Sequence, residues 1–135
     1  MPDTDDWRLD HTGIGVANMG RSARFYDAAL GAMGLRAVVR LTKTFEIADG
    51  GDNSDLVGIG YGAAYPLFWI DVFHAHGMRQ HTAFRARSRE EVQAFHAAAL
   101  SAGGQDNGGP ALRGGDYPPG YYAAFALDPD GKQQY

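Results

Sequence analysis

The chain has 135 residues and a formal net charge of −4, so it has the size of one domain with room for a core. The acidic balance argues against nucleic acid as a partner, because phosphate binding requires a basic face. The absence of cysteine excludes a disulfide scaffold and thiolate metal sites, and agrees with a reducing cytoplasm as the compartment. No apolar run has the length of a membrane span, so we expect no membrane partner.

The first half of the chain predicts a strand, a helix and three further strands. Residues 9–17 alternate as a strand. Asn18 is a suitable N-cap for a helix whose apolar residues, Phe25 to Met33, fall at helical spacing. The later strands are predicted at 35–41, 56–61 and 67–73.

The second half predicts the same order. A strand is expected at 80–86, and Ser88 to Glu91 form a capping box that marks a helix start. Residues 105–120 are rich in glycine and proline and predict a long loop. Residues 121–127 predict a strand, 128–131 a tight turn and 132–135 the start of a last strand.

An internal repeat organises these elements. The segment His11–Gly34 recurs without a gap as His81–Gly104, at a constant offset of 70 residues. We expect one α+β domain over 1–135, built from two βαβββ modules at about 8–73 and 79–135. Paired modules place their helices on one side of a curved mixed sheet and leave a cup-shaped cavity on the other. By strand parity, His11 and His81 both face the cup.

The same parity selects other candidate cup residues. Trp69, Asp71 and Phe73 share one face of their strand, where the two aromatic residues form either plain core or a stacking surface for a flat ligand. Arg85 shares the face of His81, and it either pairs with an acid such as Asp71 or awaits an anionic ligand.

The long loop of the second half supplies further candidates. Arg113, Tyr117 and the adjacent Tyr122 lie in or beside it, and the loop is either a lid or a surface excursion. His74 and His76 face the same way at a strand end, where a polar loop entry is favoured over a metal site.

Three segments carry a family resemblance: DHTGIGVANMGRSARFYDAAL, HTAFRARSREEVQAFHAAALSAGG and YYAAFALDPDG. In this order they resemble the vicinal oxygen chelate superfamily, which includes glyoxalase I, bleomycin-resistance proteins and extradiol dioxygenases. The resemblance covers nearly the whole chain. It implies paired βαβββ modules and commonly a homodimer.

The resemblance also implies a metal site. In metal-using members the first-strand histidine of each module is a ligand, which here means His11 and His81. The resemblance then implies one bound divalent ion, which is Zn, Ni, Fe, Co or Mn. The alternative is a protein that binds no metal. The carboxylate positions of the family fall at Tyr135 and near Trp69, so both hold aromatic residues. Asp71 is the candidate third ligand, because an N/O site requires three or four donors.

Three functions follow as hypotheses. The first is a metal-dependent enzyme of the lyase, isomerase or dioxygenase type that acts on a small molecule. The second is a metal-free binding protein that sequesters an aromatic or drug-like molecule. The third is an interaction module whose homodimer is the functional unit. The expected substrate-binding residues are Trp69, Phe73, Arg85, Arg113, Tyr117 and Tyr122.

Overall fold

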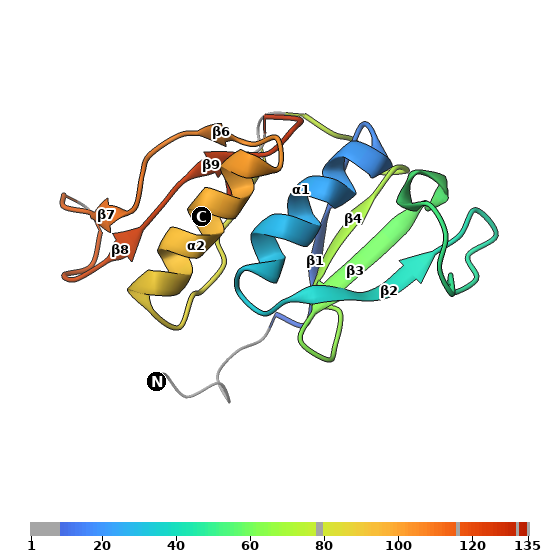
Figure 1. Cartoon of the computed structure of the whole chain (residues 1–135), viewed down its shortest axis with the longest axis horizontal. Coiled ribbons are helices and arrows are strands. Elements are labelled where there is room, and N and C mark those ends of the chain that lie inside the picture. The colour runs from blue at the N-terminus through green and yellow to red at the C-terminus, as the bar shows by residue number, and fades with distance from the viewer. Residues whose placement is uncertain (1–8, 78–79, 116, 132, 135) are drawn as a thin grey trace.

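A computed structural model describes residues 9–77, 80–115, 117–131 and 133–134. It confirms the α+β fold, with two helices on one side of mixed sheets (Figure 1). In the part of the chain that is described, no helix is long and apolar enough to cross a membrane.

The first half forms a four-stranded sheet in the order β1-β4-β3-β2. β1 runs parallel to β4, and the β4–β3 and β3–β2 pairs are antiparallel. A short 3₁₀ helix, Asn53–Asp55, precedes β3. The other elements are β1 (Thr12–Gly15), α1 (Met19–Gly31), β2 (Arg36–Leu41), β3 (Gly58–Gly62) and β4 (Phe68–Asp71).

The second half repeats the plan with shorter strands, in a sheet of order β5-β10-β9-β6 and a separate pair β7-β8. β5 pairs with β10 in parallel, as β1 pairs with β4. The elements are β5 (His81–Thr82), α2 (Arg89–Ser101), β6 (Gln105–Asp106), β7 (Ala111–Leu112), β8 (Tyr122–Ala123), β9 (Ala126–Leu127) and β10 (Gln133–Gln134).

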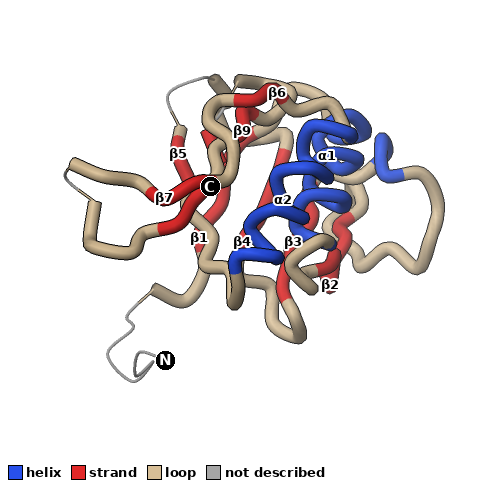
Figure 2. Tube along the Cα trace, turned by 60° about the vertical axis from the view of Figure 1, so that its left-hand side comes forward, coloured by secondary structure: helices blue, strands red, loops and turns tan. Residues whose placement is uncertain are grey.

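Both helices begin at the predicted residues. The Asn18 side chain accepts a hydrogen bond from the Arg21 amide at 2.9 Å, and the Ser88 hydroxyl accepts one from the Glu91 amide at 3.1 Å. Each side chain satisfies an amide that has no partner within its helix. The two helices lie side by side in Figures 1 and 2, so the two halves of the chain contact each other through α1 and α2.

The core lies between α1 and the first sheet. Phe25 and Tyr26 of α1 and Phe68 and Ile70 of β4 are fully buried, and Phe95 of α2 extends this cluster into the second half. The Tyr26 and Phe68 rings lie 5.4 Å apart. Burial of this kind contributes about 1.5–3 kcal/mol for each large apolar side chain.

Two predicted strands are shorter than expected. The strand predicted at 80–86 is paired only at β5, and the strand predicted at 121–127 is divided into β8 and β9. Among the described residues, β5 and β9 pair with β10 through Gln133 and Gln134, whereas β8 pairs with β7 in a separate sheet. Tyr135, where the predicted last strand ends, lies outside the described residues.

The DPDG turn joins the second half to α1. The buried Tyr26 hydroxyl donates to the buried Asp128 carboxylate at 2.6 Å. The Arg21 guanidinium donates to Asp130 at 2.6 Å, and the Ala17 amide donates to the same side chain. The turn predicted from Asp128 to Gly131 therefore also fixes the start of α1.

Two buried tyrosines predict a loss of stability in alkaline solution. Burial, and then the nearby Asp128, raises the pKa of Tyr26 well above its usual value; burial, and then Asp27, raises the pKa of Tyr61. A tyrosine whose pKa is higher in the folded chain than in the unfolded chain stabilises the fold. This stabilisation is complete when the pH lies below the unfolded pKa of about 10, and it is lost as the pH rises above that value.

We expect the free energy of unfolding to fall above about pH 10 by up to about 1.4 kcal/mol per pH unit for each tyrosine. Urea unfolding between pH 8 and pH 11 measures this slope. Tyr61→Phe should reduce the slope, and replacement of the exposed Tyr117 by phenylalanine is the control. Equal slopes for the two variants would contradict the assignment.

Candidate functional site

β1 and β4 place several predicted site residues on the sheet face away from the helices. Phe68 and Ile70 are buried against α1, so the alternation of β4 directs Trp69 and Asp71 to the opposite face. Gly13 of β1 lies directly beside Trp69 in the register of the two strands. The strand parity expected from the sequence therefore holds for this half.

Glycines form the floor beneath Trp69. In β3, Gly58, Gly60 and Gly62 alternate with the buried Ile59 and Tyr61. A Cβ atom at Gly60 would lie 2.9 Å from Cε2 and Cζ2 of Trp69, and one at Gly13 would lie 3.1 Å from the Trp69 Cβ. The indole therefore rests directly on strand backbone, in space that a side chain would fill.

A hollow of about 460 Å³ opens beside this indole, and we call it the Trp69 hollow. Its volume is in the usual range for small-molecule sites. It is lined by His11, Thr12, Gly13, Leu41, Gly58, Trp69, Asp71, Phe73 and His74. Four of the predicted site residues thus lie together, namely His11, Trp69, Asp71 and Phe73.

Each histidine of the Trp69 hollow is held by a carboxylate. His11 Nδ1 lies 2.7 Å from Asp10 Oδ2, which also accepts a hydrogen bond from the Tyr65 hydroxyl at 2.8 Å. The hydrogen bonds from His11 and Tyr65 lower the pKa of Asp10. His74 Nδ1 lies 2.7 Å from Asp71 Oδ2.

Asp71 is buried and fixed from several directions. Its Oδ1 accepts hydrogen bonds from the backbone amides of Phe73 and His74, at 3.1 and 2.8 Å. Its other oxygen holds the His74 ring. The Nε2 atoms of His11 and His74 make no hydrogen bond to any residue that the structure describes. Among the described residues, these two nitrogen atoms therefore keep their capacity for a further bond.

These residues supply part of a metal site. A carboxylate that orients a histidine ring is the usual support of a metal-binding histidine, and the Trp69 hollow contains two such pairs. Within the described ranges, however, no three histidine, aspartate or glutamate side chains are grouped so that they can hold one ion. His81 does not line this hollow, and the oxygens of Asp71 already accept hydrogen bonds. The described residues of the Trp69 hollow therefore supply two nitrogen ligands for an ion, from His11 and His74, and no assured third ligand.

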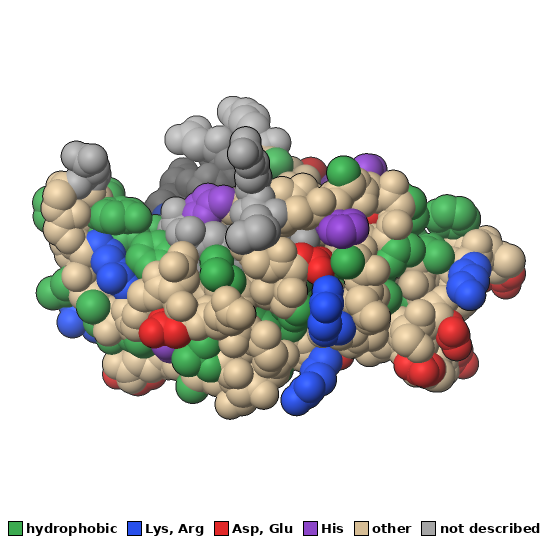
Figure 3. Space-filling view, turned by 90° about the horizontal axis from the view of Figure 1, so that it is seen from above, with side chains coloured by type: hydrophobic (Ala, Val, Ile, Leu, Met, Phe, Trp, Pro, Cys, Tyr) green, Lys and Arg blue, Asp and Glu red, His purple; other side chains and the backbone are tan. Residues whose placement is uncertain are grey.

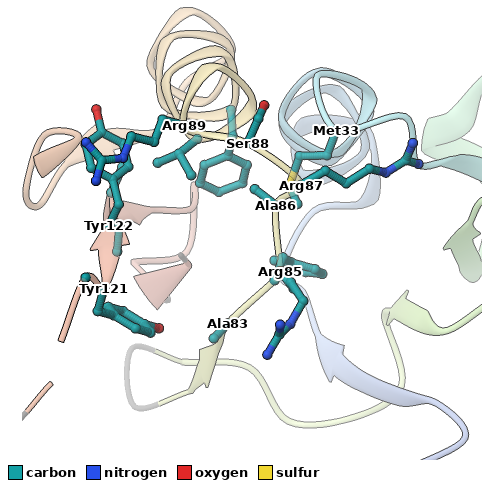
Figure 4. A pocket seen from close by; sticks show the side chains of 15 residues that line it. Met33, Ala83, Arg85, Ala86, Arg87, Ser88, Arg89, Tyr121 and Tyr122 are labelled. Carbon is teal, nitrogen blue, oxygen red and sulfur yellow. The ribbon is translucent and has the colours of Figure 1, made fainter. Parts of the chain in front are cut away.

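Two other predicted residues line a second hollow, of about 540 Å³, which we call the Arg85 hollow (Figure 4). It lies between residues 83–89, α2 and β8. Arg85 and Tyr122 both line it. Tyr122 is fixed on α2, because the Arg89 guanidinium lies 4.7 Å from its ring and Gln93 donates to its hydroxyl at 3.0 Å.

The remaining predicted residues support the loop of the second half. Arg113 donates to the carbonyl oxygen of Ala123 at 2.8 Å, and its guanidinium lies 4.6 Å from the Phe125 ring. Tyr117 stacks on Tyr121, with ring centroids 5.0 Å apart. Neither Arg113 nor Tyr117 lines either hollow.

The structure places His74 beside Asp71 and Arg85 in the other hollow. His74, interpreted as part of a polar loop entry, lies in the Trp69 hollow and pairs with Asp71. The available signal was the spacing of three residues between the two, which lets a residue after a strand fold back on the strand end. Arg85, for which Asp71 was one suggested partner, lines the other hollow.

Comparison with known proteins identifies the family. Residues 8–133 match the model of the Glyoxalase/Bleomycin resistance protein/Dioxygenase superfamily, and the chain belongs to this superfamily. The expected resemblance is thereby confirmed. No curated protein matches the chain.

Solved structures of similar fold agree with this membership. A glyoxalase/bleomycin resistance protein from Albidiferax ferrireducens is 28% identical, with a TM-score of 0.67 and 93% coverage of both chains. A glyoxalase-related enzyme from Fulvimarina pelagi is 19% identical, with a TM-score of 0.60 and coverage of 95% of this chain and 85% of that one. A variant of glyoxalase I from Zea mays is 17% identical, with a TM-score of 0.59, and the match covers 92% of this chain and 44% of that one. The last two show the fold alone.

Proposed function

We propose that the chain binds a small planar organic molecule in the Trp69 hollow. The observation that carries this proposal is the indole of Trp69, which lies on a glycine floor and forms part of the hollow's lining. A flat indole beside an apolar hollow favours an aromatic ligand, because offset stacking adds about 0.5–1.5 kcal/mol to the burial of area. Leu41 and Phe73 extend the apolar lining.

The two histidines give this ligand site its polar anchors. With Nδ1 directed at a carboxylate, a neutral imidazole carries its proton there and leaves Nε2 as an acceptor. His11 and His74 therefore favour a ligand that carries hydroxyl or N–H groups at the edge of its ring. Planar phenols and aromatic amides are the chemical classes that meet both requirements.

Tryptophan fluorescence provides the test. The sequence contains two tryptophans, and Trp7→Phe leaves Trp69 as the single indole. Titration with a panel of planar phenols and aromatic amides should quench its emission in a saturable way. Aliphatic alcohols and amides of similar size are the matched control ligands, and equal quenching by both series would contradict the proposal.

A metal-dependent enzyme of the glyoxalase type is the second candidate function. The two carboxylate–histidine pairs favour it, since they are the support that metal-binding histidines require. A bound divalent ion would supply a Lewis acid that polarises an oxygen atom of the substrate. In this candidate His11 and His74 are the nitrogen ligands, and His81 and Asp71 remain predicted ligands from the sequence.

Thermal shifts against Zn²⁺, Ni²⁺, Fe²⁺, Co²⁺ and Mn²⁺ test this candidate in untagged protein. Stabilisation by one ion that is lost in both His11→Ala and His74→Ala would support it. His76→Ala is the matched control, because this nearby histidine does not line the hollow. An equal shift in all three variants would refute the assignment of His11 and His74 as ligands.

We also propose that the chain forms a homodimer. Large apolar side chains remain exposed near the Trp69 hollow, with exposed fractions of 64% for Phe45, 74% for Ile47 and 56% for Phe73. The Phe45 and Phe73 rings contact each other, with centroids 5.9 Å apart. Light scattering should give twice the chain mass, and Phe45→Ser should shift it toward the monomer. A monomer at every concentration would contradict this proposal.

A further inference from the structure

The sequence contains three places where an aspartate or an asparagine directly precedes a glycine. They are Asp49–Gly50, Asn107–Gly108 and Asp130–Gly131. In such a pair the amide nitrogen of the glycine can attack the side-chain carbonyl carbon of the residue before it, because glycine has no Cβ atom to crowd the approach. The attack requires an amide that is not engaged in a hydrogen bond and a backbone that can rotate. The surroundings of each pair therefore decide whether it reacts in the folded chain.

The pair Asn107–Gly108 is fixed by three hydrogen bonds after β6. The Gly108 amide, which would be the attacking group, donates to Asp106 Oδ1 at 3.0 Å. The Asn107 amide donates to the Phe125 carbonyl at 3.0 Å, and the Phe125 amide donates to the Gly108 carbonyl at 2.7 Å. The attacking nitrogen is thus engaged, and the backbone on both sides of it is tied to Phe125.

The pair Asp130–Gly131 is fixed within the DPDG turn. The Gly131 amide donates to the Asp128 carbonyl at 2.8 Å. Only 4% of the Asp130 side chain is exposed, and its carboxylate accepts hydrogen bonds from the Arg21 guanidinium and the Ala17 amide. Here both the nitrogen and the carboxylate that would react are held in place.

The pair Asp49–Gly50 lacks such restraints. Both residues are exposed, and neither makes a hydrogen bond to any residue that the structure describes. A Cβ atom at Gly50 or at Gly51 would have no atom within 4 Å apart from its chain neighbours, so the backbone lies in open space. This segment after β2 forms one end of the molecule, where acidic side chains reach solvent (Figures 1 and 3). The attacking nitrogen and the carboxyl group are both available there.

We propose that Asp49 is a site of spontaneous modification, at which the folded chain forms a succinimide and then isoaspartate. The Gly50 nitrogen forms a bond to Cγ of Asp49, and the bond from Cγ to one carboxyl oxygen breaks. The amide proton and the carboxyl hydroxyl leave together as water. A second water molecule then opens the ring. Cleavage between the nitrogen and the main-chain carbonyl carbon of Asp49 gives isoaspartate, whereas cleavage at Cγ returns aspartate, and no step consumes an oxidant or a reductant.

Peptide mapping by mass spectrometry measures the reaction at all three pairs in one sample. The full chain is incubated at neutral pH, either folded or unfolded in guanidinium chloride, so that each pair is compared with its own intrinsic rate. On folding, we expect the rate at Asp49 to change by less than about threefold and the rates at Asn107 and Asp130 to fall by about tenfold or more, because a hydrogen-bonded pair reacts only in the rare conformations in which it opens. A rate at Asp49 that falls on folding as far as the rate at Asp130 overturns the proposal.

A second measurement assigns the product to one residue. An isoaspartyl methyltransferase with labelled S-adenosylmethionine marks isoaspartate, because it methylates the α-carboxylate that the rearrangement exposes. The label should appear in the tryptic peptide 44–79 and be lost in Asp49→Glu, which keeps the charge but would have to close a larger ring. Label that persists in this peptide of the variant would assign the reaction to another residue and overturn the proposal. Asp49 and Gly50 line neither hollow, so none of these results depends on the function proposed above.

Discussion

Replacement of Trp69 by alanine is expected to weaken the binding of a planar ligand by about thirtyfold or more. Truncation of a central aromatic residue in a binding site typically costs about 2 kcal/mol or more, and about 1.4 kcal/mol corresponds to a tenfold change in affinity. The loss is expected to be large because the glycine floor leaves no other side chain to replace the ring. Gly13, Gly58 and Gly60 all lie on this face.

Isothermal titration calorimetry with the best ligand of the fluorescence panel measures this change. Trp69→Phe is the matched variant, because it keeps an aromatic ring on the same backbone, and we expect it to retain part of the affinity. The midpoint of thermal unfolding of each variant shows whether the fold is preserved. Unchanged affinity in a folded Trp69→Ala chain would remove the basis of the proposed function.

The substitution Gly15→Ala is expected to lower the free energy of unfolding by about 1–3 kcal/mol or more, as overpacking does when backbone must move. A Cβ atom at Gly15 would lie far inside van der Waals contact with the carbonyl oxygens of His74 and Ala75. The chain after β4 crosses directly over β1 at this glycine. The substitution should therefore displace His74 from Asp71 as well as destabilise the fold.

Gly31→Ala provides the control for this substitution. Gly31 is the last residue of α1, and a Cβ atom there would have no neighbour within 4 Å. Alanine in place of a helical glycine is expected to be neutral or to stabilise by about 0.5–1 kcal/mol. Urea unfolding of both variants gives the comparison. A Gly15→Ala chain as stable as the parent would show that the crossing segment is not held where the structure places it.

Local sequence signals predicted well those helices and helix ends that do not depend on residues distant in the sequence. Asn18 and Ser88 cap the two helices as expected, because capping depends on a side chain and an amide three residues apart. The repeat from His11 and from His81 correctly placed the two helices in equivalent positions. The lengths of β5, β8 and β9 were not predictable in this way, because they depend on pairing with strands that are distant in the sequence.

The positions of the candidate residues, as distinct from their roles, were predicted in part. The parity of β4 correctly put Trp69 and Asp71 on one face with His11, because alternation along a strand is a local property. The division of the remaining candidates between two hollows depends on how the halves pack, which parity does not determine. Arg85 therefore lines a hollow separate from Trp69, although parity had directed both residues to one cup, and the loop residue Tyr122 lies with Arg85.

In the proposed function, a planar ligand is held against Trp69 on the face of the first sheet. A crystal structure of the chain with the best ligand of the panel tests it most directly. We expect an aromatic ring with its centroid about 4.5–7 Å from that of the Trp69 indole, and a polar group at Nε2 of His11 or His74. A ligand bound in the Arg85 hollow, or with no contact to Trp69, would contradict it.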